Sequence, residues 1–220
     1  MSEVPGSGVS ERWIEWRRTV DLIKYDQRWD AMAARGDSIH GEADFVERLV
    51  GERKVRLLDA GCGTGRLAIE MVKRGHHAVG ADLDPDMIDR AATKAPHIDW
   101  HVADLSEMSL DSKFEVIVMA GNIPLFCAPS SQAAIIQSLA DHLVQGGYLI
   151  SGFSLEARPD AYERHDYQRD AISAQLTEVA VYSTWDEHPS NDGDDYTVML
   201  HQKNYFSLSS VFLKQQRIGI

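Results

Sequence analysis

The chain has 220 residues, a formal net charge of -12 at pH 7, and 44% hydrophobic residues. Such a length and composition are typical of a globular protein with one core of ordinary size. The negative charge disfavours non-specific binding to nucleic acid or anionic lipid, because both carry charge of the same sign. Apolar runs are far shorter than a bilayer span and no secretion signal is recognisable, so we expect a cytoplasmic protein without nucleic-acid or membrane partners.

The first part of the chain is expected to be helical. After a loose polar tail up to about residue 10, apolar side chains recur at steps of three and four, which predicts one or two amphipathic helices that end at Gly36. A further helix is predicted over 41–50, before Gly51. The apolar residues with helical spacing are Trp13, Trp16, Val20, Ile23, Tyr25, Trp29 and Met32. Residues 1–54 are therefore assigned to an N-terminal extension, either a mobile lid or a permanently docked pair of helices.

The next part alternates β-rich runs with helical patterns. Such alternation predicts βαβ units and a parallel sheet with helices on both faces. The predicted strands are 55–59, 77–82, 98–102, 114–120 and 148–153, and the helical stretches between them include 66–74, 85–93 and 131–144.

The C-terminal part continues with a polar helix over about 160–174 and two β-rich runs, 178–185 and 196–203, separated by the turn-rich "DEHPSNDGDD". These two runs are expected to pair antiparallel and close the sheet. We thus predict an α/β fold, a three-layer αβα sandwich with a mostly parallel seven-stranded sheet. Its ligand-binding domain is assigned to residues 55–203, and residues 204–220 to a C-terminal tail.

Three glycines follow the first predicted strand in "LLDAGCGTGR". Asp59 ends the strand, and Gly61, Gly63 and Gly65 then alternate with other residues before the next helix. Glycines in a strand-to-helix turn let a ligand approach the main chain without meeting a Cβ atom. A turn seldom needs three glycines in five residues for geometry alone, so the loop is expected to contact a ligand.

The spacing of the glycines argues against two phosphate-binding loops. The dinucleotide fingerprint places its third glycine five residues after the first, a position that Arg66 occupies here. The phosphate loop of nucleotide triphosphatases needs a Lys-Ser or Lys-Thr pair after its glycines, and this chain has neither.

The stretch "DAGCGTG" instead resembles the first motif of class I S-adenosylmethionine-dependent methyltransferases. The resemblance implies a Rossmann-like fold, S-adenosyl-L-methionine as cofactor, and a glycine loop that lies against its aminoacyl part. It also implies an acid that holds the ribose hydroxyls at the end of the second strand, where Asp82 is best placed. Asp84 precedes Pro85 and is more simply the N-cap of the next helix.

Later segments continue the resemblance in the same order. "HVADL" resembles the segment whose acid accepts from the adenine amino group, which nominates Asp104 and the main chain of Leu105, although Asp104 also fits a helix cap. "VIVMAGNIPLF" resembles the fourth-strand motif beside the reacting methyl group. Asn122 in it either meets the cofactor or substrate or simply forms a turn. "LVQGGYLISGF" matches the glycine hairpin that leads into the fifth strand.

The resemblance yields one set of candidate residues. The expected cofactor-binding residues are Asp59, Ala60, Gly61, Cys62, Gly63, Gly65, Asp82, Leu83, Asp104, Leu105, Ala120, Tyr25 and Trp29. Tyr25 and Trp29 are included because the segment before the first strand folds over the cofactor in many relatives. His40 and Asn122 are the weak catalytic candidates, and His40 equally fits a cap or a surface histidine.

The predicted function is methyl transfer by in-line displacement to a small-molecule acceptor. The segment "GNIPLF" departs from the N-P-P-Y motif of enzymes that methylate adenine or glutamine nitrogen. Neither Cys62 nor Cys127 follows a proline, as the cysteine of cytosine methylases does. No metal is expected, since no histidine-carboxylate cluster has ligand spacing, and both thiols are expected to be reduced. The protein is expected to be a monomer or homodimer. The alternatives are a non-catalytic S-adenosylmethionine-binding module and a nicotinamide-dependent oxidoreductase.

Overall fold

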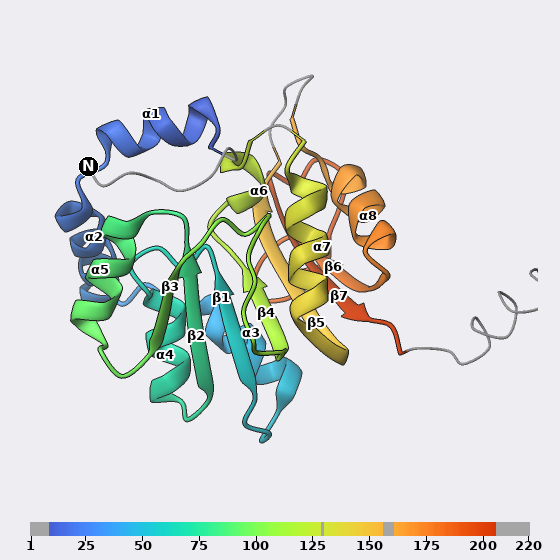
Figure 1. Ribbon diagram of the computed structural model, residues 1–220, viewed down its shortest axis with the longest axis horizontal. Coiled ribbons are helices and arrows are strands. Elements are labelled where there is room, and N and C mark those ends of the chain that lie inside the picture. Colours follow the sequence, from blue (N-terminus) through green and yellow to red (C-terminus); the bar gives the residue numbers. More distant parts are fainter. Residues whose placement is uncertain (1–8, 129, 156–160, 206–220) are drawn as a thin grey trace, which may run out of the picture.

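The computed structural model describes residues 9–128, 130–155 and 161–205, and Figure 1 shows their arrangement. Seven strands form one sheet between layers of helices, with α3 and α4 on one face and α7 and α8 on the other. The strands are β1 (Arg56–Ala60), β2 (His77–Asp82), β3 (Asp99–Val102), β4 (Phe114–Met119), β5 (Leu143–Ser154), β6 (Leu176–Tyr182) and β7 (Tyr196–Lys203). The helices are α1 (Glu11–Thr19), α2 (Leu22–Ala34), α3 (Gly41–Val50), α4 (Arg66–Lys73), α5 (Pro85–Lys94), α6 (Ile123–Phe126), α7 (Gln132–His142) and α8 (Arg164–Ser173).

The strand order is β3-β2-β1-β4-β5-β7-β6. Strands β1 to β5 run parallel, whereas β7 pairs antiparallel with both β5 and β6. The predicted fold class is thereby confirmed. Because the order of the parallel strands reverses between β1 and β4, their carboxyl ends diverge there and leave the crevice in which open α/β sheets bind ligands.

Both faces of the central strands are buried, which explains why they read as apolar runs. Leu58 packs into the core layer under α7 and α8, and its neighbour Leu57 packs into the layer under α3 and α4. Both side chains are fully buried. Burying a leucine contributes about 1.5 to 3 kcal/mol, so residues of this kind hold the strand ends, and the loops that follow them, in place.

Strand β5 begins at Leu143, five residues before the predicted start at 148, and α7 ends at His142 rather than at 144. The predicted glycine hairpin before this strand is therefore wrong. Gly146 has a φ of +75°, and the register between β4 and β5 shifts between Phe114 and Val116. Between these two pairs β5 has three more residues than β4, and the glycine pair lies in this irregular stretch of one long strand, where Gly146 supplies the left-handed backbone.

The N-terminal helices differ from one another in burial. Helix α3 buries four residues in the core, whereas α1 and α2, which lie wholly within the described residues, bury none. Figure 1 shows α1 across the carboxyl ends of the parallel strands and α2 beside α5. The division into 1–54, 55–203 and 204–220 stays a prediction, and most of the expected tail lies outside the described residues. No helix in the described ranges is long and apolar enough to cross a bilayer.

Candidate cofactor and active site

A cavity of about 550 Å³ opens at the carboxyl ends of the parallel strands. Its floor is formed by the loops that follow β1, β2, β3 and β4, and its roof by α1 and α2. This volume lies within the range of ~300–1,000 Å³ that is usual for small-molecule sites. The residues of α1 and α2 that line the cavity, here called the roof residues, are Trp13, Trp16, Tyr25, Arg28 and Trp29.

Most of the predicted cofactor residues line this cavity. They are Asp59, Gly61, Cys62, Gly63, Asp82, Leu83, Asp104, Leu105, Ala120, Tyr25 and Trp29, together with the catalytic candidate Asn122. Ala60 and Gly65 are not among the lining residues. Ala60 is fully buried in the core of the sheet. The expectation that these two residues contact the cofactor is therefore not supported.

The three glycines of the loop have different roles. All three have a positive φ: +79° at Gly61, +53° at Gly63 and +83° at Gly65. A Cβ on Gly63 would meet no described atom closer than 3.9 Å. By contrast, a Cβ on Gly61 or Gly65 would stand closer than 3.0 Å to the side chain of Ile123 or of Trp100, respectively. Gly63 alone of the three has room for a Cβ, whereas the other two make room for the protein's own side chains.

Asp82 lies at the carboxyl end of β2 and faces the loop. Its carboxylate accepts hydrogen bonds from the backbone N–H groups of Gly63 (2.7 Å) and Asp84 (2.9 Å). Burial raises the pKa of Asp82 to about 6, although these bonds favour the charged form. The side chain is thus held rigidly between the glycine loop and the start of α5, with an acceptor group turned to the cavity.

Asp59, the acid that precedes the glycines, supports the loop from behind. Its carboxylate accepts from the backbone N–H of Ala68 at 3.0 Å, in the first turn of α4. Burial raises the pKa of Asp59 to about 7. A carboxylate at a helix N-terminus satisfies a backbone donor that has no partner inside the helix, so Asp59 fixes how α4 leaves the loop.

Asp84 is the N-cap of α5, as predicted, and it accepts from the backbone N–H of Asp86 at 2.9 Å. It also lines the cavity, and the guanidinium of Arg17 on α1 pairs with it and, at 2.6 Å, with Asp86. The Asp84 side chain is only 3% exposed. The Asp84 carboxylate therefore caps α5 and also binds α1 through Arg17.

We expect Asp84→Ala to lower the free energy of unfolding by about 1 to 3 kcal/mol, because it removes the cap and one partner of a largely buried ion pair. Asp84→Asn keeps a capping oxygen and should lose less. Urea denaturation of both variants measures the difference. Equal losses for the two would mean that the cap contributes nothing.

The other two polar candidates, Asp104 and Asn122, both accept hydrogen bonds from the protein itself. Asp104 accepts from the backbone N–H (2.9 Å) and the hydroxyl (2.6 Å) of Ser106 through a single oxygen, Oδ1. Asn122 has a φ of +68°, and its Oδ1 accepts from the backbone N–H of Ser154 at 2.8 Å. Asn122 therefore forms a turn, one of the two roles considered for it, and fastens the end of β4 to the end of β5 while it lines the cavity.

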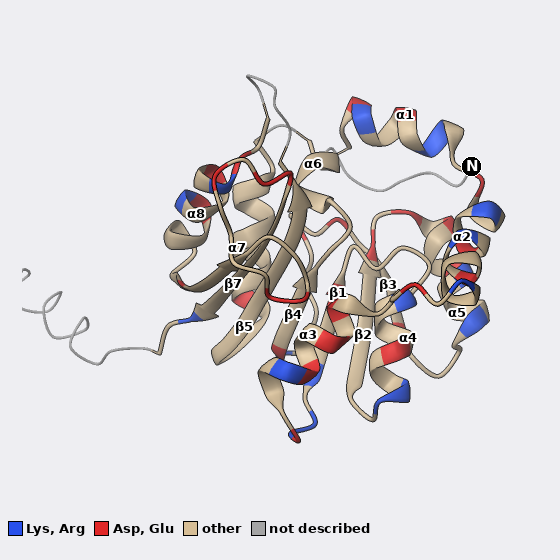
Figure 2. Ribbon diagram, turned by 180° about the vertical axis from the view of Figure 1, so that it is seen from behind, with Lys and Arg blue, Asp and Glu red and all other residues tan. Residues whose placement is uncertain are grey.

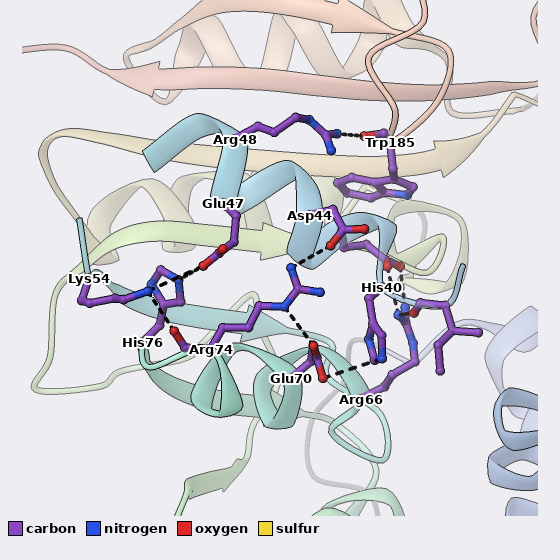
Figure 3. Close-up of polar contacts among 12 residues, drawn as sticks. His40, Asp44, Glu47, Arg48, Lys54, Arg66, Glu70, Arg74, His76 and Trp185 are labelled. Carbon is purple, nitrogen blue, oxygen red and sulfur yellow. Dashed lines mark hydrogen bonds and ion pairs between the residues drawn. The ribbon is translucent and has the colours of Figure 1, made fainter. Parts of the chain in front are cut away.

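His40 is not brought to the cavity. It precedes α3, and its Nε2 lies 3.7 Å from a carboxylate oxygen of Glu70 on α4, as Figure 3 shows. Glu70 also accepts from Arg74 at 2.9 Å, and Arg74 donates to Asp44 on α3 at 2.7 Å. His40 thus belongs to a polar seam between α3 and α4, and its geometry gives no support to a catalytic role.

Several cavity residues were not among the predicted site residues. Trp16 on α1 packs against Tyr25 on α2 and Phe126 on α6, with ring centroids 6.3 and 5.7 Å away. The guanidinium of Arg66 lies 4.3 Å from the ring centre of Trp29, and it also pairs with Glu42 on α3. The aromatic residues of this segment had favoured a lid over the cofactor, and the tryptophans do line the cavity. Nothing in the sequence indicated that Phe126 and Arg66 would pack against them.

Within the described part of the chain, no group of three or more His, Cys, Asp or Glu side chains has an arrangement that could hold a metal ion. The two cysteines are free thiols. Burial raises the pKa of Cys62 well above its usual value, and that of Cys127 to about 11. Both are therefore protonated at neutral pH and poor nucleophiles.

Comparisons with known proteins agree with this geometry. Residues 57–147 match the family described as a methyltransferase domain. The crystal structure of a TehB-like S-adenosylmethionine-dependent methyltransferase from Corynebacterium glutamicum is 32% identical to the chain. The likeness covers 83% of this chain and 98% of that one, with a TM-score of 0.75. The chain belongs to the S-adenosylmethionine-dependent methyltransferases.

Curated methyltransferases match over shorter stretches. A magnesium-protoporphyrin O-methyltransferase from Rhodobacter capsulatus is 33% identical over 79 residues, which are 34% of this chain and 35% of that enzyme. A tRNA 5-carboxymethoxyuridine methyltransferase from Escherichia coli is 46% identical over 54 residues, 24% of this chain and 21% of that enzyme. The chain thus matches only about a third or less of the length of these two methyltransferases, which act on very different acceptors.

Proposed function

We propose that this methyltransferase transfers the methyl group of S-adenosylmethionine to a small-molecule acceptor inside the cavity. The observation that carries the proposal is the Asp82 carboxylate, which accepts from the N–H of Gly63 at the wall of the cavity that both residues line. A carboxylate held at the end of the second strand suits a ribose with two neighbouring hydroxyls, since its oxygens accept from both.

The residues that line the cavity fit the rest of the cofactor. Asp104 and Leu105 would hold the adenine, Asp82 the ribose, and the backbone of Gly61 to Gly63 the aminoacyl end. When bound, the cofactor supplies a methyl group that is already activated for displacement. What remains for the protein is to align the acceptor with that group and to exclude water, which the aromatic roof is suited to do.

A small acceptor suits the enclosure and the charge of the molecule. The roof residues cover the cavity with aromatic rings from α1 and α2. Figure 2 shows Lys and Arg dispersed over the helices and interleaved with Asp and Glu, and the net charge is -12. A polyanionic acceptor such as tRNA would need a continuous basic surface, so we rank it second.

We further propose that α1 and α2 form a lid that closes when the cofactor is present. Both helices lack buried residues and are held mainly by aromatic contacts and ion pairs at the cavity. Segments with few buried apolar contacts open at low free-energy cost, which a lid requires.

The proposal predicts micromolar dissociation constants for S-adenosylmethionine and S-adenosylhomocysteine, equivalent to about -7 to -9 kcal/mol, measured by calorimetry. Incubation of the protein with small-metabolite extract, tRNA and isotopically labelled cofactor should then transfer label to a compound in the metabolite fraction. Label in the tRNA would identify the second-ranked acceptor instead.

Two results would reject the proposal. Binding of both sulfur cofactors without transfer of label to any fraction would favour a non-catalytic binding module. Saturable fluorescence titration with NADH, together with no binding of either sulfur cofactor, would favour the oxidoreductase.

A further inference from the structure

One hydrogen bond joins the roof to the glycine loop. Thr64 lies between Gly63 and Gly65, and the residue is only 2% exposed. Its hydroxyl donates to Asp26 Oδ1, on α2, at 2.6 Å. These partners are 38 residues apart in sequence, and α2 has no buried residue of its own, so this bond is a specific attachment point of an otherwise superficial helix.

Asp26 is held in place from a second side. Arg90 on α5 donates to its Oδ2 at 2.9 Å, and Lys94 donates to Oδ1 at 3.2 Å. Burial alone would raise the pKa of Asp26, but the hydrogen bonds from Thr64, Arg90 and Lys94 lower it below its usual value. The carboxylate is therefore ionised at neutral pH, and the Thr64 hydroxyl makes a charge-assisted bond to it.

The Thr64–Asp26 bond lies beside the groups that would hold the cofactor. Gly63, the residue before Thr64, donates its N–H to Asp82 and lines the cavity. Tyr25, the residue before Asp26, lines the cavity, and its hydroxyl is the nearest atom to the place a Gly63 Cβ would take. Gly63 is thus linked to α2 by one peptide bond and one hydrogen bond.

We propose that Asp26 and Thr64 are positioning residues that couple the glycine loop to α2, so that cofactor binding and closure of α2 are one equilibrium. The inference rests on the proposed function, because it takes the cavity to be the cofactor's. A bound cofactor would fix the loop, and the fixed loop would present the Thr64 hydroxyl to Asp26. Linkage makes the effect reciprocal. The factor by which the bound cofactor favours the closed position of α2 equals the factor by which the closed position raises the affinity for the cofactor.

The test compares Thr64→Val, which keeps the shape but removes the hydroxyl, with Thr64→Ser, which keeps the hydroxyl. A charge-assisted hydrogen bond is worth about one to two powers of ten in an equilibrium constant. We expect Thr64→Val to weaken S-adenosylhomocysteine binding about tenfold in calorimetry, and Thr64→Ser to stay within about twofold of the wild type.

Amide hydrogen exchange over Leu22–Ala34, with and without ligand, distinguishes coupling from a purely structural bond. Loss of a purely structural bond would not change how much the ligand slows the exchange. In the wild type, S-adenosylhomocysteine should slow exchange of these amides. In Thr64→Val the ligand, at a saturating concentration, should slow them much less, while the amides of β1 and β4 stay protected. Asp26→Ala, which removes the acceptor oxygen, should behave like Thr64→Val and serves as the second variant if that protein does not fold. Asp30→Ala, which removes an exposed acid on the same helix, is the matched control and should behave like the wild type.

A double-mutant cycle identifies the bond itself. If Asp26 acts through Thr64, the double variant should lose little more affinity than the worse single variant. Wild-type affinity and wild-type ligand-dependent exchange in both Thr64→Val and Asp26→Ala would overturn the coupling and leave the proposed function standing. Additive losses in the double variant would likewise overturn it. No binding of S-adenosylhomocysteine by the wild type would overturn both proposals.

Discussion

Asp82→Ala is expected to weaken S-adenosylhomocysteine binding by about ten- to a hundredfold without unfolding the protein. A charge-assisted hydrogen bond contributes about 1.5 to 3 kcal/mol, and the proposed ribose contact rests on this carboxylate. The carboxylate also orders the loop through the N–H of Gly63, so the loss should lie toward the upper end of the range. Calorimetry measures the affinity, and a thermal melt checks the fold.

The pH dependence of binding provides an independent check of the same residue. The pKa of Asp82 is raised to about 6, so the free protein loses this negative charge as the pH falls through 6. Hydroxyl donors favour the charged carboxylate, and protonation therefore competes with the ligand. Affinity should be constant above about pH 7 and should fall by up to about tenfold per pH unit well below pH 6.

Asp82→Asn, which cannot ionise, serves as the control. It should bind weakly at every pH and lack the acid limb of the profile. An acid limb that persisted in Asp82→Asn would belong to another group, such as Asp59, whose pKa is about 7. An affinity that is the same for Asp82→Asn and the wild type at pH 8 would refute the assignment of Asp82 to the cofactor.

Gly65→Ala is expected to lower the free energy of unfolding by about 2 to 5 kcal/mol. A left-handed backbone costs an alanine about 1 to 2 kcal/mol, and overpacking costs about 1 to 3 kcal/mol more. Gly65 has a φ of +83°, and a Cβ there would stand closer than 3.0 Å to the Trp100 ring and 3.1 Å from the Cβ of Ala91. The ring cannot easily withdraw, because its Nε1 donates to the carbonyl of Ala95 at 2.9 Å.

The matched control is Gly36→Ala. Gly36 has nearly the same φ, +85°, but no described atom lies within 4 Å of the added Cβ, so this variant should show only the backbone strain. Replacing Trp100 by Leu in the Gly65→Ala background should recover part of the loss. If Gly65→Ala and Gly36→Ala lost equal stability in urea denaturation, the packing role of Gly65 would be wrong.

The sequence by itself determined the class of fold and the core of the site. Strand β2 and the cap at Asp84 were predicted from local patterns, and the structure confirms both. Such features depend on neighbours a few residues apart, whose alternation or hydrogen-bonding capacity is readable in the chain. The glycine spacing placed the first loop of the cavity floor for the same reason, since a strand-to-helix turn brings its own residues to the carboxyl edge of the sheet. The other floor residues were nominated by the resemblance to the methyltransferase motifs.

Only the tertiary structure separated the roles of residues that look alike in sequence. Gly63 faces the cavity and Gly65 faces a tryptophan from β3, although both are glycines of one loop with a positive φ. His40 follows a stretch that does cover the cavity, yet it points to Glu70 on another helix. These outcomes depend on which distant side chain fills the neighbouring space, and a local pattern carries no information about that.

The position of α1 and α2 over the cavity was likewise determined only by the tertiary structure. Helical periodicity identified an aromatic face on α1 and α2, but the contacts that place this face over the cavity join residues far apart in sequence. Thr64 and Asp26 are 38 positions apart, and Arg17 and Asp84 are 67. Polar partners at such separations meet only after the sheet has assembled and has set the distance between α2, the glycine loop and α5, so their pairing belongs to the fold and cannot be read from either segment alone.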